Sequence, residues 1–416
     1  MLQSVKKLFR LFNPELPPRV WLLQLGVLIN FFGNGLVAPF LVIYLHFGRG
    51  IPFVVAGSAV ALGGLTAVTS GIVAGAVADR IGPRNTLVAA MTLNAVAYLL
   101  YTQVTAPWQA FGVGLLVGVG TGSYGPSSQL LIASMVPPAN RRAAFAQNRV
   151  TSVTGLGLGG IAGGLLAAAG PPGYLRILEL DSGTFLAFAA VVLLLPSGRS
   201  ASSAVARGSY RAVLRDAPFI RLAATNLAMV SAGIAPMFWL LPAYAKGQLH
   251  IGETVIGAIY SVNTLTVVLA QLPLARLTQG RNPMHALRTG ALIWVGCWLA
   301  CLAAGAALSV AAAVAVIGLA AMAYAVGECL YSSIMLPTAT QLAPDHLRGR
   351  YLGVMGMAWQ GGFFIGPSLG GAILGAFPPA LPVACALGCL VAAGASIAAD
   401  RSLATDKRLA PAGAAS

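Results

Sequence analysis

Residues 120–164 read GTGSYGPSSQLLIASMVPPANRRAAFAQNRVTSVTGLGLGGIAGG, and the same pattern recurs 207 residues later, without a gap, at residues 327–371. The second copy reads GECLYSSIMLPTATQLAPDHLRGRYLGVMGMAWQGGFFIGPSLGG. Each copy consists of an apolar segment, a basic loop and a Gly-rich apolar segment. Tyr124 aligns with Tyr331, and a proline and an arginine of the loop match as well as the glycines. Because several residue types match at one offset, the stretch predicts two related halves.

The composition indicates a membrane protein. Of 416 residues, 57% are hydrophobic and 8% are charged, whereas a soluble domain carries roughly 25% charged residues. A membrane-spanning helix needs about 20 mostly apolar residues, and the chain contains many such runs. We therefore predict an all-α polytopic membrane protein with twelve transmembrane helices in two six-helix bundles. The expected spans are 20–46, 52–77, 85–105, 108–134, 144–169, 177–196, 218–246, 251–275, 286–308, 310–337, 350–375 and 379–399.

The basic residues predict the orientation. With both termini cytoplasmic, 22 of the 25 Lys and Arg residues fall in cytoplasmic segments, and only Arg49, Arg176 and Lys246 fall on the other side. The net charge of +15 thus reflects topology and requires no nucleic-acid partner.

The longest polar segment predicts the division of the chain. We expect an N-terminal bundle at 1–196, a cytoplasmic linker at 197–217, and a C-terminal bundle with a short cytoplasmic tail at 218–416. Six helices per half is an even number, so both halves share one orientation, as in transporters built from parallel repeats.

The loop after the second expected span contains Gly75, Asp79, Arg80, Gly82 and Arg84. A carboxylate beside two arginines can form a charge-assisted latch, and glycine permits a tight turn. Together with the two-times-six layout, this loop resembles the signature loop of the major facilitator superfamily, in particular its 12-helix drug:proton antiporters. The resemblance implies that the aspartate pairs with charges and a helix end of the other half and closes the cytosolic side. A solvated turn is the alternative.

Small residues are concentrated in the fifth and eleventh expected spans, where they allow close helix packing. The residues concerned are Gly155, Gly159, Gly163 and Gly164, and Gly362, Gly366, Pro367, Gly370 and Gly371. The eleventh span resembles the GxxxGPxxGG antiporter motif, which drug:proton exporters carry in the fifth helix; here the fifth span has Gly160 in place of the proline. The resemblance favours export, although helix packing alone explains the glycines almost as well.

Glu328 is expected to be the one acidic residue within a span, since the other nine of the ten fall in loops or near helix ends. It lies about ten residues, or ~15 Å, from the cytosolic end of its span. Such a group is costly in a membrane and is expected to face the interior or a water-filled cavity. We expect Glu328 to carry the coupling proton or to pair with a cationic substrate. The alternative is a permanently protonated side chain bonded between helices.

The family resemblance implies that the first, fourth, seventh and tenth helices line a central path. The cavity candidates are Asn30, Asn34, Tyr124, Trp239, Tyr331 and Glu328, together with Trp359 and Gln360 of the eleventh helix. A site with aromatic side chains, few polar groups and one acid suits lipophilic small molecules, cationic ones included. Each aromatic residue taken alone also fits helix packing or lipid contact.

The leading interpretation is a secondary active transporter that exports lipophilic small molecules or drugs by alternating access, coupled to protons. The alternative is proton-coupled transport of a specific metabolite such as a sugar or an amino acid. The four histidines are scattered and no catalytic motif is present, so we expect no enzyme. We expect a monomer in the bacterial cytoplasmic (inner) membrane whose partners are a small-molecule substrate, protons and membrane lipid. The proton gradient supplies the energy, and no cofactor, metal or nucleic acid is expected.

Overall fold

The computed structural model describes residues 16–137, 140–197, 210–306, 309–344 and 347–403, which form helices joined by short turns. The N-terminal helices are α2 (Pro18–Val37), α3 (Leu41–Ile43), the π-helical segment η1 (Tyr44–Gly48), α4 (Phe53–Ile81), α5 (Pro83–Tyr101), α6 (Pro107–Met135), α7 (Arg141–Ala167) and α8 (Pro171–Leu193). The C-terminal helices are α9 (Tyr210–Leu214), α10 (Ala217–Met229), the π-helical segment η3 (Val230–Ile234), α11 (Ala235–Trp239), α12 (Leu241–Leu249), α13 (Glu253–Thr278), α14 (Pro283–Gly305), α15 (Val310–Leu342), α16 (Arg348–Ala376) and α17 (Ala380–Leu403).

The helices follow the expected spans closely, and the chain is a multi-pass membrane protein. Within the described residues, eight helical stretches are long and apolar enough to cross a membrane. α5, α6, α8 and α16 do not meet that criterion, so the count of twelve spans remains a prediction. α8 carries three charged residues, Arg176, Glu179 and Asp181, which lower its mean hydropathy.

Two expectations about individual spans were wrong. The sixth helix begins at Pro171, six residues before the expected start at 177, because we left Arg176 outside the span. The first and seventh spans are not continuous helices. α2 ends at Val37, and the chain turns at Pro39 before α3 and η1; the seventh span is divided into α10, η3, α11 and α12. Interrupted helices at corresponding positions of two repeats often mark a transport site.

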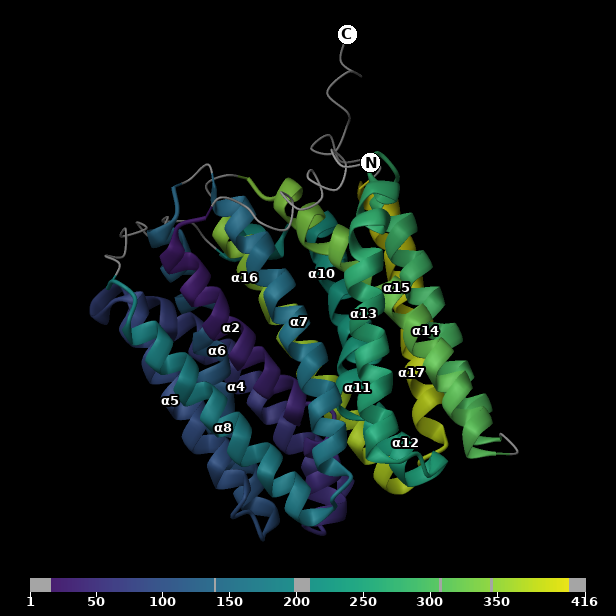
Figure 1. Ribbon diagram of the computed structural model, residues 1–416. Helices are drawn as coiled ribbons and strands as arrows, with labels where there is room; N and C mark the ends of the chain where they lie inside the picture. Colours follow the sequence, from purple (N-terminus) through teal and green to yellow (C-terminus); the bar gives the residue numbers. More distant parts are fainter. Residues whose placement is uncertain (1–15, 138–139, 198–209, 307–308, 345–346, 404–416) are drawn as a thin grey trace, which may run out of the picture.

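The helix contacts divide the bundle into two groups with matching packing. In the first group α2 packs on α7 and α8, α5 on α6 and α8, and α4 on α6. In the second group α10 packs on α16 and α17, α14 on α15 and α17, and α13 on α15. Figure 1 shows the first group in purple to teal on the left and most of the second in green to yellow on the right, with α16 passing behind α7 of the first group. The groups touch through α4 with α16 and α7 with α13.

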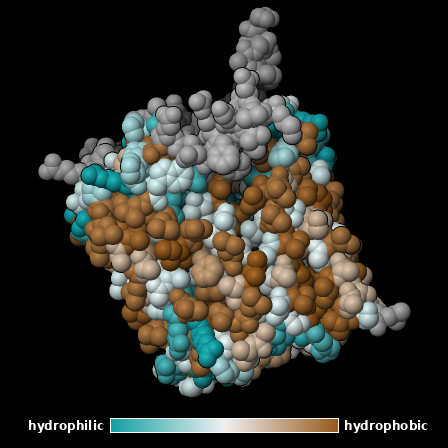
Figure 2. Space-filling model, viewed as in Figure 1, coloured by the Kyte–Doolittle hydropathy of each residue, from teal (hydrophilic) through white to brown (hydrophobic). Residues whose placement is uncertain are grey.

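The surface of the bundle is apolar between two polar ends. Large hydrophobic side chains such as Ile72, Leu165, Leu269 and Leu319 are exposed on the outer faces of several helices. Figure 2 shows hydrophobic residues as a brown band between teal ends on the face in view. A water-soluble protein rarely exposes so large an apolar surface, so this band is the surface that faces the lipid.

The two ends of the bundle differ in charge. α2 begins, and α4 and α6 end, at the end that lies uppermost in Figure 1. This end carries Arg80, Arg84 and Arg141, among other arginines, and we call it the basic end. The turns after η1, α5 and α7 lie at the opposite end. The expected linker 197–217 connects the halves at the basic end; its residues 198–209 lie outside the described part of the chain, and α9 occupies 210–214.

Candidate substrate and proton site

A cavity of about 350 Å³ lies among the C-terminal helices, on the side that faces the N-terminal half. Its walls come from α10, η3, α15 and α16, and one residue of the other half, Arg149 of α7, also lines it. A Cβ added at Gly356, on the wall of the cavity, would meet no described heavy atom within 4 Å. The walls therefore leave open space around this part of α16.

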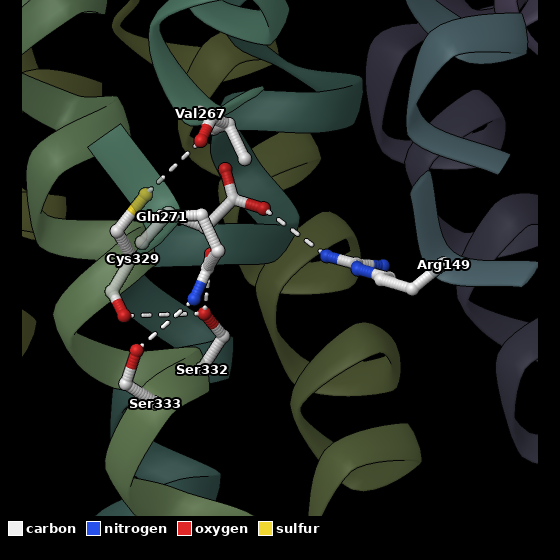
Figure 3. A network of polar contacts seen from close by, with 7 residues as sticks. Arg149, Val267, Gln271, Cys329, Ser332 and Ser333 are labelled. Carbon is white, nitrogen blue, oxygen red and sulfur yellow. Dashed lines mark hydrogen bonds and ion pairs between the residues drawn. The ribbon is translucent and has the colours of Figure 1, made fainter. Parts of the chain in front are cut away.

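Glu328 projects into this cavity and faces Arg149. Its Oε1 lies 3.9 Å from Nη2 of Arg149, which Figure 3 shows reaching in from a separate helix. The Glu328 side chain is 16% exposed and that of Arg149 is 65% exposed, so the pair lies where the cavity meets solvent. α15 continues to Leu342, so Glu328 is roughly 21 Å from the end of its helix at 1.5 Å per residue. The acid is thus deeper than the expected ~15 Å.

A set of hydrogen bonds joins α13 to the part of α15 that directly follows Glu328. Gln271 of α13 donates from Nε2 to Ser333 Oγ and accepts at Oε1 from Ser332 Oγ, both at 3.0 Å. Cys329 Sγ donates to the Val267 carbonyl at 3.7 Å. Figure 3 shows these contacts beside Arg149. Because Glu328 directly precedes Cys329, these bonds hold the backbone position from which its side chain projects.

Replacing Gln271 by Leu removes both hydrogen bonds and leaves two serine hydroxyls without this partner. Hydrogen bonds between membrane helices contribute about 0.6 kcal/mol on average, so we expect a loss of roughly 1 kcal/mol of stability. The thermal midpoint of the purified protein should fall accordingly. Thr266→Val is the matched control, because the exposed Thr266 hydroxyl bonds only within its own helix. An equal loss in both variants would contradict the role given to Gln271.

Aromatic side chains form the inner wall of the cavity. The Tyr331 hydroxyl donates to Asn226 Oδ1, and Asn226 Nδ2 donates to the Met355 carbonyl at 3.1 Å. The Trp359 ring lies 5.9 Å from that of Tyr331, centroid to centroid. Since Asn226 and Tyr331 satisfy each other, this wall presents ring faces more than free polar groups.

The expected cavity residues separate into two sets. Glu328, Tyr331 and Trp359 line the cavity together, whereas the remaining five are placed elsewhere. Asn30 is buried in α2, Asn34 donates to the Asn30 carbonyl, Tyr124 packs on Phe31 and Phe188, Trp239 ends α11, and Gln360 donates to the Gly64 carbonyl of α4. In this conformation the cavity is formed almost entirely by the C-terminal half.

The glycines of α7 pack on two different helices. Gly155, Gly159 and Gly163 lie against α2, where an added Cβ would meet backbone atoms of residues 28–36. Gly160 and Gly164 face the other half, where Gly257 of α13 is their neighbour. These two sets of small residues let α7 approach one helix of its own half and one of the other.

α16 repeats this arrangement. Gly362 and Gly366 lie against η3 and α11, and Gly370 lies against Leu240 between α11 and α12. Pro367 and Gly371 face Gly57 of α4 in the N-terminal half. Gly57 is near the start of α4 and Gly164 near the end of α7, so the close contacts between the halves lie toward the opposite end. The repeat thus produces two equivalent seams.

The loop after α4 shows part of the expected gate. Gly82 has φ of 86°, a conformation that favours glycine, and it forms the turn between α4 and α5. Arg84 Nη1 donates to the Leu195 carbonyl at 2.9 Å, so this arginine binds its own half. Arg80 is exposed, and a Cβ added at Gly75 would meet no described atom within 4 Å. The side chain of Asp79 lies outside the described residues.

Sequence reasoning missed two charged groups. We counted Arg149 as a loop residue, but it lies in the third turn of α7 and faces the cavity. We also placed Asp181 near the end of its span, whereas it lies ten residues inside α8 and is 0% exposed. The repeat offered a signal for the arginine, because its aligned residue in the second half is Gly356, which lines the same cavity.

Two repeat-related helix bundles with a polar cavity where they meet form the architecture of a membrane transporter. A family model described as Major Facilitator Superfamily matches residues 23–367 and, in a second match, 224–412. The chain belongs to this superfamily of transporters, and a small-molecule substrate follows from the family.

The relatives differ in how specifically they are named. An uncharacterized MFS-type transporter, YhjO of Bacillus subtilis, is 25% identical over 355 residues, which is 85% of each chain. The multi-drug resistance efflux pump PmrA of Streptococcus pneumoniae is 32% identical over 128 residues, covering 31% of this chain and 32% of that protein. Among solved structures, the nucleoside transporter NupG (D323A mutant) superposes with a TM-score of 0.75 at 14% identity, covering 92% of this chain and 99% of NupG. That similarity shows the fold alone.

Proposed function

We propose that the protein is a proton-coupled secondary transporter that exports lipophilic small molecules, cationic ones included, by alternating access. The halves correspond to the bundles expected at 1–196 and 218–416, and the basic end faces the cytoplasm, with both termini on that side. The protein works as a monomer in a bacterial cytoplasmic membrane and uses the proton gradient. The similarity to PmrA over part of the chain supports export.

The observation that carries this proposal is the Arg149–Glu328 pair. One member comes from α7 of the N-terminal half and the other from α15 of the C-terminal half. A proton on Glu328 would remove its negative charge and with it the attraction to Arg149. The protonation state of Glu328 would therefore change the interaction between the halves at the basic end, which is what coupling to protons requires.

The same pair gives a cationic substrate a way to bind. Glu328 is the acidic group of the cavity, and the Trp359 and Tyr331 rings lie beside it. A lipophilic cation could place its charge at Glu328 in place of Arg149 and its apolar part on the rings. At 3.9 Å the pair is longer than a close hydrogen-bonded ion pair, so displacing the guanidinium costs little.

The alternative substrate is a specific metabolite, and one observation favours it. Arg149 places a largely exposed guanidinium at the edge of the cavity, and guanidinium groups bind carboxylates and phosphates well. A neutral sugar could only accept hydrogen bonds from this group, whereas an amino acid or another carboxylate would also gain from its charge. The NupG superposition leaves this choice open, because one fold serves many substrates.

A pH jump across proteoliposomes tests the proposed function. With the purified protein inserted, an imposed proton gradient should drive movement of tetraphenylphosphonium, a lipophilic cation, against the proton flow. A parallel panel of amino acids and sugars in counterflow tests the alternative. Tetraphenylphosphonium movement without any dependence on the pH gradient would overturn proton coupling. Counterflow of an amino acid without tetraphenylphosphonium movement would favour the metabolite transporter.

A further inference from the structure

The N-terminal half contains a buried carboxyl group that the proposed function does not use. Asp181 of α8 is 0% exposed, and it lies ten residues from the start of the helix at Pro171, or roughly 15 Å from the opposite end. Its Oδ1 accepts a hydrogen bond from the Thr184 hydroxyl at 3.1 Å. Its Oδ2 is buried and has no hydrogen-bond partner among the described residues.

Among the described residues, Asp181 forms no ion pair. α8 packs on α5, α2, α7 and η1, and Tyr98 of α5 is the titratable side chain that lies close enough to interact with Asp181. Of the remaining titratable residues on these helices whose side chains are described, Arg149 pairs with Glu328 and none pairs with Asp181. They are Arg19, Tyr44, His46, Arg84, Tyr101, Arg141, Arg149, Tyr174, Arg176 and Glu179.

The space around the carboxyl is also closed. A Cβ added at Gly33 of α2 would collide with Asp181 Oδ1 and with the Thr184 hydroxyl, so the α2 backbone lies directly on the carboxyl. On the same face of α2, Gly26 contacts Phe188 of α8, and Asn30 lies between these glycines. The Asn30 Oδ1 is a second buried acceptor without a donor. A carboxylate here would be out of water with one hydrogen bond, from the Thr184 hydroxyl, which makes this a costly place for a negative charge.

We propose that Asp181 is a proton-binding site of the N-terminal half, separate from Glu328 in the other half. A bound proton removes the uncompensated negative charge. It also gives Oδ2, which has no hydrogen-bond partner among the described residues, a hydrogen to donate. The site lies next to the interruption of the first span, since α2 ends at Val37, one turn after Gly33. A change in the bend there would shift the Gly33 backbone against the carboxyl and alter its proton affinity.

The second part of the inference rests on the proposed function: the Asp181 proton is exchanged during the transport cycle. Glu328 reaches the cavity that faces the basic end, whereas Asp181 is buried nearer the opposite end. Two acids at different depths, one in each half, would meet protons from different sides of the membrane. Asp181 would then hold its proton while the opposite end is closed and release it when that end opens.

Infrared difference spectroscopy on the whole protein in lipid tests the proton site without any substrate. Spectra taken between low and high pH should contain the carbonyl stretching band of a buried protonated carboxyl, which Asp181→Asn removes and Glu328→Gln retains. Thr184→Val, which removes the one hydrogen bond to Oδ1, should shift the band and not delete it, so this variant serves if Asp181→Asn does not fold. A band untouched by both Asp181→Asn and Thr184→Val, or one that does not change with pH, would overturn the site.

Transport then tests the role of the proton. In proteoliposomes, Asp181→Asn should reduce pH-gradient-driven accumulation of tetraphenylphosphonium relative to its passive exchange. Accumulation equal to that of the wild type would overturn the role in the cycle while leaving the spectroscopic proton site in place. If the wild-type protein does not move tetraphenylphosphonium at all, the proposed export function fails. The infrared result still decides whether Asp181 binds a proton.

Discussion

Glu328→Gln is expected to reduce pH-gradient-driven transport to the level of liposomes without protein. Glutamine has nearly the same shape as glutamate but neither binds nor releases a proton, so it cannot alternate between a charged and a neutral state beside Arg149. The variant should remain folded, because the Arg149 side chain is 65% exposed and stays solvated when its partner charge is lost. The measurement is the flux of tetraphenylphosphonium after a pH jump, together with gel filtration of the purified variant.

The substrate dependence of the same variant separates the two roles of the acid. If Glu328 acts as a proton carrier alone, passive exchange of tetraphenylphosphonium survives the substitution. If Glu328 also binds the cation, exchange of the cation falls while that of a neutral lipophilic compound is retained. Glu179→Gln is the matched control, since Glu179 is exposed on α8. A Glu328→Gln protein with wild-type pH dependence would refute the assignment of this residue.

The order of helices and the way in which they pack could be predicted because both depend on patterns along the chain. Runs of apolar residues gave the positions of the helices, and the 207-residue offset related their packing faces. Gly160 and Gly164 face α13 just as Pro367 and Gly371 face α4. A helix repeats its faces every 3.6 residues, so equal spacing in two copies leads to equivalent seams.

The charged groups could not be placed in the same way. A charged residue lowers the local hydropathy of the sequence equally whether it lies within a span or in a loop. Arg149 and Asp181 each lie where the apolar run weakens, and we therefore counted Arg149 with a cytoplasmic segment and Asp181 with a helix end. In the structure Arg149 is solvated through the cavity, while Asp181 is enclosed by α2 and α5. Whether a polar side chain faces a cavity, a neighbouring helix or lipid depends on the packing of several helices, which no single segment reveals.

The cavity residues predicted besides Glu328 show a related limit of sequence-based prediction. Tyr124 and Tyr331 are aligned by the repeat, yet Tyr331 lines the cavity and Tyr124 packs inside the N-terminal half. The two tyrosines are equivalent in the repeat, but in the conformation of this structure their surroundings differ. Because the cavity lies mostly on one side of the seam, equivalence in sequence predicts equivalent backbone positions and does not predict equal access to the cavity.

Tyr174→Phe is expected to favour a conformation that is open at the opposite end. The Tyr174 hydroxyl, on α8 of the N-terminal half, donates to Glu253 Oε1 at 2.6 Å and accepts from Lys246 Nζ at 2.7 Å. Lys246 and Glu253 belong to the C-terminal half and form an ion pair with each other. One hydroxyl thus connects the halves next to the glycine seam, and removing it leaves the ion pair in place.

The expected size of this effect follows from the type of bond. Hydrogen bonds to charged groups contribute about 1.5 kcal/mol or more, and ~1.4 kcal/mol corresponds to a tenfold change in an equilibrium constant. The ratio of open to closed molecules should therefore rise about tenfold. The cation–π contact of Lys246 with Phe47, at 5.2 Å, keeps part of the attraction and sets a limit to the change.

Spin labels at Thr105→Cys and Ala306→Cys measure this change, because these exposed residues lie in turns of different halves at the opposite end. The five native cysteines are buried, so labelling should be selective. In Tyr174→Phe the population with a long distance between the labels should grow. Tyr44→Phe is the matched control, since its hydroxyl bonds the Tyr101 carbonyl within one half. Equal distance distributions in Tyr174→Phe and the wild type would contradict the role given to the Tyr174 hydroxyl in holding this end closed.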